Sequence, residues 1–164
     1  MASQLLDLLQ PGAPNLSLLA ILGALGLAAA RTYTIYLAET NRVNGGWSNV
    51  NPRAYVLQLA TKVSAGGKLT PLEAKILRGQ SAQANGFENA PLFGLVMLIG
   101  TYAKLPSHTL NRTAAFYLVG RAIFNYLYLT TTSKKNSYLR TIVFNAGVIA
   151  LLRIIVLSTL QINN

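Results

Sequence analysis

The chain has 164 residues, of which 52% are hydrophobic and only 11% are charged. Soluble domains have about 25% charged residues, so this composition argues against an ordinary soluble globular protein. Fourteen Lys and Arg residues against four Asp and Glu give a formal charge of +10, which first suggests a nucleic-acid partner. The sequence has no cysteine and one histidine, so it excludes disulfides, thiolate nucleophiles and Cys-ligated or multi-His metal sites.

The first apolar segment predicts a membrane-spanning helix over residues 16–37. It follows a Pro-Asn pair and consists mainly of Leu, Ala, Gly and Ile. About 20 apolar residues, at 1.5 Å per residue, are needed to cross the ~30 Å hydrocarbon core of a bilayer. Small side chains allow another helix to approach closely, and this segment has three candidates for such a contact, Gly23, Gly26 and Ala30.

A second, longer helix is predicted from Pro71 to Lys104. Thr70 and Pro71, with Glu73 in the first turn, form a typical helix start signal. The predicted helix would be roughly 50 Å long at 1.5 Å per residue, which exceeds the hydrocarbon core. We therefore expect its first turns to project beyond the membrane, and Pro91 to introduce a kink.

Two more spans are predicted, over residues 110–130 and 138–160, joined by the short polar loop 131–137. The predicted fold is therefore all-α, a single integral membrane domain forming a four-helix bundle. An even number of spans places both termini on one side of the membrane.

The cations predict the orientation of these spans. The connector from Glu39 to Thr70 contains an apolar stretch at 54–63, which predicts a short interfacial helix. Most of the basic residues outside the spans lie in this connector or in the loop before the fourth span, which the positive-inside rule places in the cytoplasm. Because basic residues alternate with spans long enough to cross a bilayer, we exclude a nucleic-acid partner and expect contact with membrane lipids.

Several charged residues fall inside the predicted spans, where each costs about 3 kcal/mol unless it has a partner or a function. They are Arg31, Arg78, Glu88, Arg121, Arg140 and Arg153. On the second helix, at 100° per residue, a polar stripe about three turns long is formed by Arg78, Ser81, Asn85, Glu88 and Asn89. On the third helix, Arg121, Asn125 and Tyr128 share one face.

Facing each other, these stripes would line a cavity with cationic groups, amide donors and one carboxylate. Such a cavity suits a ligand that has more than one carboxylate and one ammonium group. The alternative is that Glu88 bridges two arginines and only holds the helices together. One acid cannot neutralise several arginines, so we favour an external anion. A channel is not favoured, because the polar stripe ends near Pro91.

The second helix carries the run from Arg78 to Phe93 that resembles the signature of the MAPEG superfamily, an Arg followed by Ala/Gln-x-Asn-x-x-Glu-x-x-Pro-x-Phe. The connector motif Asn51-Pro52-Arg53 is similar to one in many smaller members. Arg121 with Tyr128 resembles the third helix of the family, and Arg140 resembles the arginine that opens its fourth helix.

This resemblance implies a homotrimer that binds glutathione between subunits near the cytoplasm, and the lack of Cys and of a second His leads us to expect no metal. Carried over to this sequence, the glutathione-binding residues would be Arg78, Gln83, Asn85, Glu88, Arg121 and Tyr128. Arg140 would be the catalytic residue that holds the sulfur. Arg31 would either assist from a neighbouring subunit or extend to the lipid headgroups.

The function implied is a membrane glutathione transferase or peroxidase that attacks a lipophilic electrophile or a lipid hydroperoxide. The sequence departs from many catalytic members at Ser81, where they have arginine, and at Phe124, where they have tyrosine. These departures favour the alternative, a non-catalytic lipid-binding or scaffold protein of the same fold. For a eukaryotic protein we expect the endoplasmic reticulum or another intracellular membrane, with the site facing the cytoplasm.

Overall fold

The computed structural model describes residues 6–163, and within them the side chains of all residues except Ala30, Arg31, Asn44 and Lys134. The chain is all-helical over this range, with no strand among the described residues, so the predicted all-α class is confirmed. Its elements are α2 (Ala20–Ala28), α3 (Ala30–Thr40), the short 3₁₀ helix η1 (Val43–Gly45), α4 (Pro52–Ser64), α5 (Pro71–Tyr102), α6 (Ser107–Thr130) and α7 (Lys134–Ile162).

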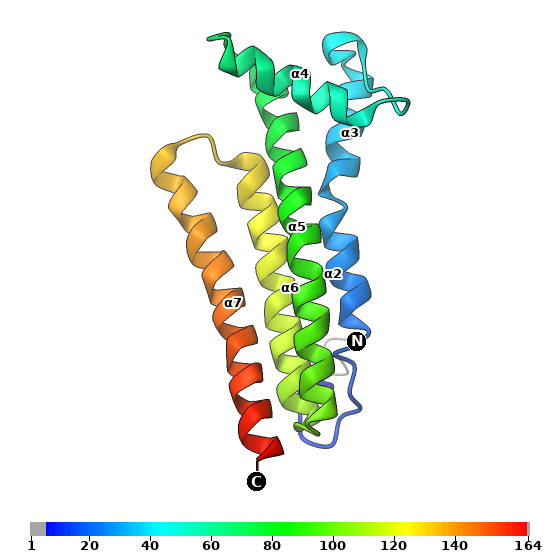
Figure 1. Ribbon diagram of the computed structural model, residues 1–164, viewed down its shortest axis with the longest axis vertical. Helices are drawn as coiled ribbons and strands as arrows, with labels where there is room; N and C mark the ends of the chain where they lie inside the picture. Colours follow the sequence, from blue (N-terminus) through cyan, green and yellow to red (C-terminus); the bar gives the residue numbers. More distant parts are fainter. Residues whose placement is uncertain (1–5, 164) are drawn as a thin grey trace.

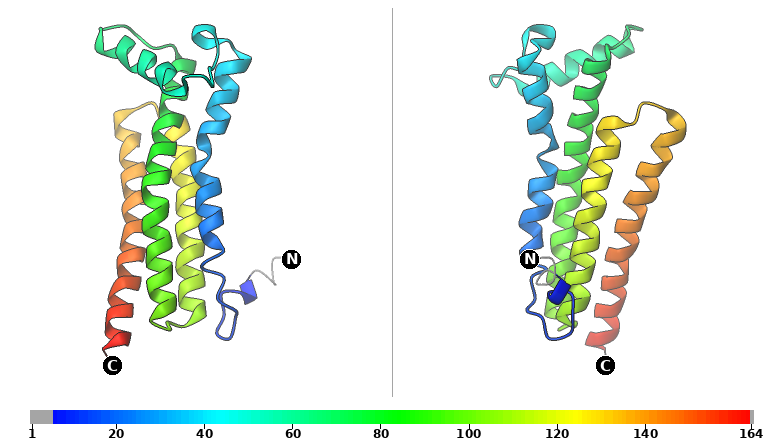
Figure 2. Two further views of the ribbon diagram at one scale, coloured as in Figure 1. Left: turned by 45° about the vertical axis from the view of Figure 1, so that its right-hand side comes forward. Right: turned by 180° about the vertical axis from the view of Figure 1, so that it is seen from behind.

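The long helices lie side by side, with α5 in the middle (Figure 1). Helix α5 contacts α2 and α3 on one side and α6 and α7 on the other. Helix α4 lies across the end where α3 finishes and α5 begins, which we call the connector end (Figures 1 and 2). The last turn of α7 and the segment 6–15 lie at the opposite end.

Helix α5 begins where its local signals predict. The Thr70 side chain accepts a hydrogen bond of 3.2 Å from the backbone N–H of Glu73, and the Glu73 carboxylate accepts one of 2.7 Å from the backbone N–H of Thr70. This capping box satisfies two backbone donors that a helix start leaves unpaired. Glu73 is also paired with Lys62 of α4 at 2.9 Å, so the start of α5 holds the connector in place.

The first predicted span is interrupted. Helix α2 ends and α3 begins around Ala29, whose backbone N–H donates to the Gly26 carbonyl, while Thr32 donates to the Ala29 carbonyl. Both are bonds over three residues instead of four, so the helix tightens for one turn at this point. Gly26, predicted to allow close packing, faces open space, whereas Ala28 packs directly on Gly86 of α5.

Two stretches of the described chain are long and apolar enough to cross a membrane, residues 20–40 and 135–162. Helices α5 and α6, which the sequence analysis also assigned as spans, are not among them. Both carry charged and amide residues in their middle turns, as at Glu88 and Arg121, which lowers their apolar character.

Two apolar clusters stabilise the fold. The larger lies among α2, α5, α6 and α7, where the rings of Phe93 and Tyr117 stack with centroids 4.3 Å apart. The smaller lies under α4 and includes Trp47, Tyr55 and Leu59. The second cluster fixes the connector against α3 and α5, so the connector end of the protein is a packed structure and not a loose loop.

Candidate functional site

A cavity of about 450 Å³ opens near the connector end, where α5, α6 and α7 meet. It brings together three residues that the sequence analysis proposed for the site, each from a different helix: Arg78 from α5, Tyr128 from α6 and Arg140 from α7. Its remaining lining consists of Leu69, Ala74, Leu77, Ser81, Thr131, Thr132, Ser133 and Ser137. Among the described residues, the lining contains two guanidinium groups and five hydroxyl side chains from Ser and Thr, but no acidic residue.

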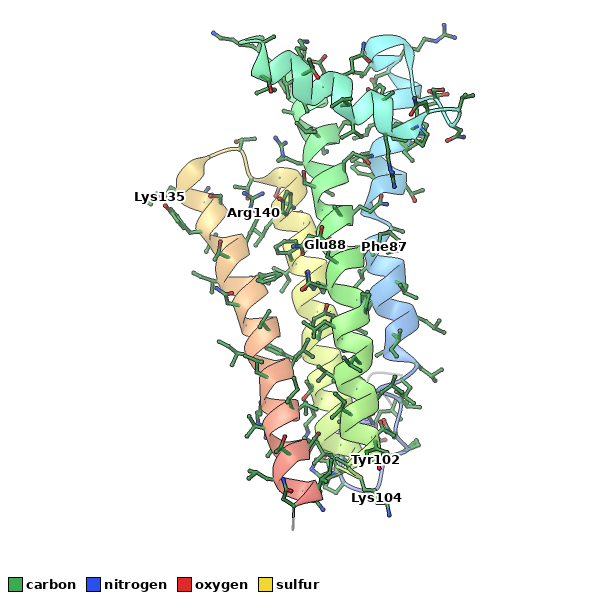
Figure 3. The ribbon with its side chains drawn as sticks, viewed as in Figure 1. Phe87, Glu88, Tyr102, Lys104, Lys135 and Arg140 are labelled. Atoms are coloured by element: carbon green, nitrogen blue, oxygen red, sulfur yellow. The ribbon has the colours of Figure 1, made fainter. Side chains whose placement is uncertain are left out.

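Arg140 is oriented by an aromatic ring. Its guanidinium carbon lies 4.3 Å from the centroid of the Tyr128 ring, which is within the range of a cation–π interaction. Arg140 lies in the second turn of α7, whose start is capped by Ser133, with its side chain accepting a hydrogen bond of 3.3 Å from the backbone N–H of Asn136. Figure 3 places Arg140 near the upper end of α7, above the level of Glu88.

Arg78 is only partly satisfied by the protein. One of its terminal nitrogens donates a hydrogen bond of 3.2 Å to the Leu129 carbonyl at the end of α6. Its Nε is buried and has no hydrogen-bond partner. Arg78 also experiences the positive charge of Arg140, so an anion placed between them would relieve this repulsion.

Arg121 and Asn85 form a separate pair deeper in the protein. The Arg121 side chain is buried and donates a hydrogen bond of 2.7 Å to the Asn85 side-chain oxygen. Three aromatic rings surround the guanidinium at 5.0 to 5.5 Å, those of Tyr117, Phe124 and Phe144. Here Arg121 and Asn85 join α6 to α5, and neither lines the cavity described above.

Glu88 and Gln83 lie outside this cavity as well. Glu88 is exposed on α5 and makes no ion pair with any described residue. The ion pair found among the described residues joins Lys62 to Glu73. Glu88 therefore does not bridge described arginines within one chain, as the alternative interpretation required. Gln83 is five positions from Arg78, about 140° around the helix, and its buried side-chain oxygen has no partner. The Arg31 side chain lies outside the described residues.

The hydroxyl residues of the α6–α7 connection line the cavity but were not among the site residues predicted from the sequence. Thr131, Thr132 and Ser133 begin three residues after Tyr128, and Ser137 precedes Arg140 by three residues. Their position between two predicted site residues was the signal available. In the sequence, however, a run of Thr and Ser is equally typical of a solvent-exposed turn.

The model of the MAPEG family matches residues 16–160, which is nearly the whole chain. The chain therefore belongs to the MAPEG family, a membrane-associated family that includes glutathione transferases and related enzymes. No curated protein and no solved structure matches the chain.

Proposed function

We propose that this protein is a membrane glutathione transferase, with peroxidase activity toward lipid hydroperoxides, that uses Arg140 to activate the thiol of glutathione. One observation carries the proposal: Arg78, Tyr128 and Arg140 line a single cavity of about 450 Å³, whose described lining residues include two arginines and no acid. Such a lining favours an anionic ligand, and the family supplies glutathione as its typical co-substrate.

The chemistry follows from the charge of Arg140. A free thiol has a pKa of about 8.5, so only a few per cent is thiolate at neutral pH. A guanidinium beside the sulfur favours the thiolate, and each unit by which the thiol pKa falls corresponds to about 1.4 kcal/mol. The thiolate then attacks a lipophilic electrophile or a hydroperoxide. The chain has no cysteine, so the reacting sulfur must come from the ligand.

Arg78 is suited to hold a carboxylate of the tripeptide, because it lines the cavity and its one hydrogen bond to a described residue uses a single terminal nitrogen. The Arg121 and Asn85 pair would position α6 against α5, in addition to any contact with glutathione. Tyr128 lies seven residues after Arg121, about two turns along α6. By holding α6 against α5, the bond between Arg121 and Asn85 would also position the Tyr128 ring that contacts Arg140.

Glu88 supports a site shared between subunits. It lies ten residues after Arg78, roughly 15 Å along α5, and is exposed on the outer surface of one chain. In a homotrimer, a neighbouring subunit would cover this surface and Glu88 would meet the ammonium group of glutathione. Gln83 would contribute from a different face of α5 than Arg78. Arg31, if it assists, would contribute from a neighbouring subunit. Glutathione would enter from the cytoplasm and the second substrate from the bilayer.

The test is a glutathione titration of the purified protein, followed by the ultraviolet absorbance of the thiolate and by conjugation of a chlorinated nitroarene. Arg140→Ala should abolish thiolate formation while binding of glutathione persists. Arg153→Ala is the matched control, because Arg153 is exposed on the same helix about 20 Å away and outside the cavity. Equal thiolate signals from wild type and Arg140→Ala would remove Arg140 from the mechanism.

The second candidate is a non-catalytic lipid-binding or scaffold protein. Two features favour it: Ser81 lines the cavity where many catalytic members have arginine, and the buried Phe124 ring, which packs near Tyr128 at 5.3 Å, carries no hydroxyl. Binding of glutathione without thiolate formation or turnover in the wild-type protein would exclude the transferase and favour this second function.

A further inference from the structure

A second cavity, of about 280 Å³, lies at the end of the protein opposite the connector. It is an open cavity lined by the start of α2, the first half of α6 and the segment 6–15, which lies beside the start of α6 (Figures 1 and 2). Its lining is Leu8, Leu9, Leu16, Ala20, Asn111, Ala114, Ala115 and Leu118. None of these residues belongs to the site proposed for glutathione.

Asn111 fastens the segment 6–15 over this cavity. Its side-chain nitrogen donates hydrogen bonds to the carbonyls of Leu8 at 2.8 Å and Pro14 at 2.9 Å, and its side-chain oxygen accepts one of 2.9 Å from the Leu16 N–H. These bonds use both N–H donors and the oxygen of the Asn111 side chain. Asn111 is the polar side chain among the described lining residues. The surface that remains for a ligand is therefore apolar.

A cation lies beside the cavity. Arg112 is exposed, and its Nε donates a hydrogen bond of 2.7 Å to the carbonyl of Leu9, which lines the cavity. The two terminal nitrogens of Arg112 have no partner among the described residues and remain available to an anion. An apolar cavity with a guanidinium beside it is complementary to an amphiphile that has an anionic head.

The surroundings indicate where this amphiphile comes from. Leu19 and Leu22, at the start of α2, are 62% and 68% exposed, and the stretch apolar enough to cross a membrane begins at residue 20, between them. This end of α2 therefore lies at the boundary between acyl chains and headgroups. Apolar cavities of about 150 Å³ bind a benzene-sized molecule, so this larger one admits several methylene groups.

We propose that this cavity binds part of one acyl chain of an anionic membrane phospholipid, whose phosphate is held by Arg112. The phospholipid would hold the segment 6–15 against α6 from the membrane side. This site is separate from glutathione chemistry, so it stands whether or not the protein proves to be an enzyme.

The test uses the full chain in phosphatidylcholine vesicles that contain a small fraction of phosphatidylglycerol with a photoreactive acyl chain. After irradiation, labelled peptides from residues 6–20 and 111–118 are quantified by mass spectrometry. Ala115→Phe fills the cavity and should reduce this labelling at least tenfold. Ala122→Phe is the matched control, because Ala122 is exposed on α6 and lies outside the cavity, and its labelling should equal that of wild type.

Three further variants keep the test independent of folding defects. Leu118→Ala enlarges the cavity, and its labelling should be at least as strong as that of wild type. Arg112→Gln should remove the preference for phosphatidylglycerol over an equivalent phosphatidylcholine probe, and Arg112→Lys should restore it. Undiminished labelling in Ala115→Phe, or a wild-type protein without preference for the anionic probe, would overturn the proposal. Displacement by a free fatty acid but not by phosphatidylglycerol would overturn the assignment to a phospholipid.

Discussion

The Arg121 guanidinium donates a hydrogen bond of 2.7 Å to the side-chain oxygen of Asn85, and this bond joins α6 to α5 in the interior of the protein. Both residues were proposed from the sequence as ligands of glutathione. The bond gives them a structural role as well, because Arg121 is buried among three aromatic rings with Asn85 as its hydrogen-bond partner. Their contact with glutathione stays a prediction.

Loss of the Asn85 side chain should destabilise the protein strongly. Asn85→Ala removes the side-chain oxygen to which the buried Arg121 guanidinium donates, which costs about 3 kcal/mol. Asn89→Ala is the matched control: the Asn89 side chain donates 2.8 Å to the Asn85 backbone carbonyl, and its loss should cost less than about 1 kcal/mol. Thermal unfolding in detergent measures both, and similar shifts for the two variants would contradict a structural role for the Asn85 side chain.

A glycine pair on two helices gives a test of close packing. A Cβ atom at Gly86 would lie 2.9 Å from the Cα and Cβ atoms of Ala28, so Gly86→Ala must push α2 away from α5. We expect a loss of about 1–3 kcal/mol in the free energy of unfolding. At Gly26 nothing lies within 4 Å of the added Cβ, so Gly26→Ala should be neutral or stabilise by up to about 1 kcal/mol. The opposite order of melting temperatures would show that α2 and α5 do not pack as described.

The ring of Tyr128 should matter more than its hydroxyl. Because Arg140 lies 4.3 Å from the ring centroid, Tyr128→Phe keeps the cation–π contact, whereas Tyr128→Leu removes it. We expect Tyr128→Leu to lose about 1 kcal/mol of this orienting interaction. Because Arg140 would then be less well placed beside the sulfur, the pKa of the bound glutathione thiol should rise. Tyr128→Phe should differ little from wild type. The pH dependence of thiolate absorbance gives this pKa for each variant, and an equal loss in both would assign the effect to the hydroxyl.

The connector should lose stability at alkaline pH. Tyr55 is buried and donates a hydrogen bond of 3.1 Å to the Val43 carbonyl, and its pKa is raised above the ordinary value of 10.0 by burial and then by the charges of Glu73 and Glu39. Because the folded state holds this proton more tightly than the unfolded state, the contribution of Tyr55 is constant below pH 10. It is lost as the pH rises from there through the folded-state pKa.

The neighbouring Trp47, the only tryptophan of the chain, reports this transition, since its ring centroid lies 5.3 Å from that of Tyr55. Tyr55→Phe should be about 1 kcal/mol less stable at neutral pH because it lacks the hydrogen bond, but it should lose the alkaline slope. Fluorescence-monitored unfolding between pH 8 and pH 11 separates the two effects. A slope retained in Tyr55→Phe would assign the transition to another group.

Local signals predicted the start of α5, but several tertiary features could not be read from the sequence. The Thr70 and Glu73 pattern specified the start of α5 because a capping box needs only residues three positions apart. The interruption at Ala29 had no such signal, since alanine has the highest helix propensity of all residues. The choice of Ala28 over Gly26 as the packing contact depends on which face of α2 meets α5, which a short apolar helix does not specify.

The site was predicted only in part, because its geometry also depends on tertiary packing. Helical spacing placed Arg78 and Asn85 on one stripe, but it could not specify that Arg78 faces a cavity while Asn85 meets a buried guanidinium. That separation arises because α7 contributes Arg140 only near the connector end, where its first turns line the cavity. Such an arrangement depends on how three helices pack, and no single helix encodes it.

The two unneutralised guanidinium groups of Arg78 and Arg140 have a practical consequence for solution work. In the absence of a ligand, we expect these guanidinium groups to bind phosphate or sulfate from the buffer. These buffer anions would compete with the carboxylate or thiolate of a ligand for the same two groups. Apparent affinities will then depend on the identity of the buffer anion and not only on ionic strength. Assays in large, weakly coordinating buffer anions should therefore yield the tightest dissociation constants.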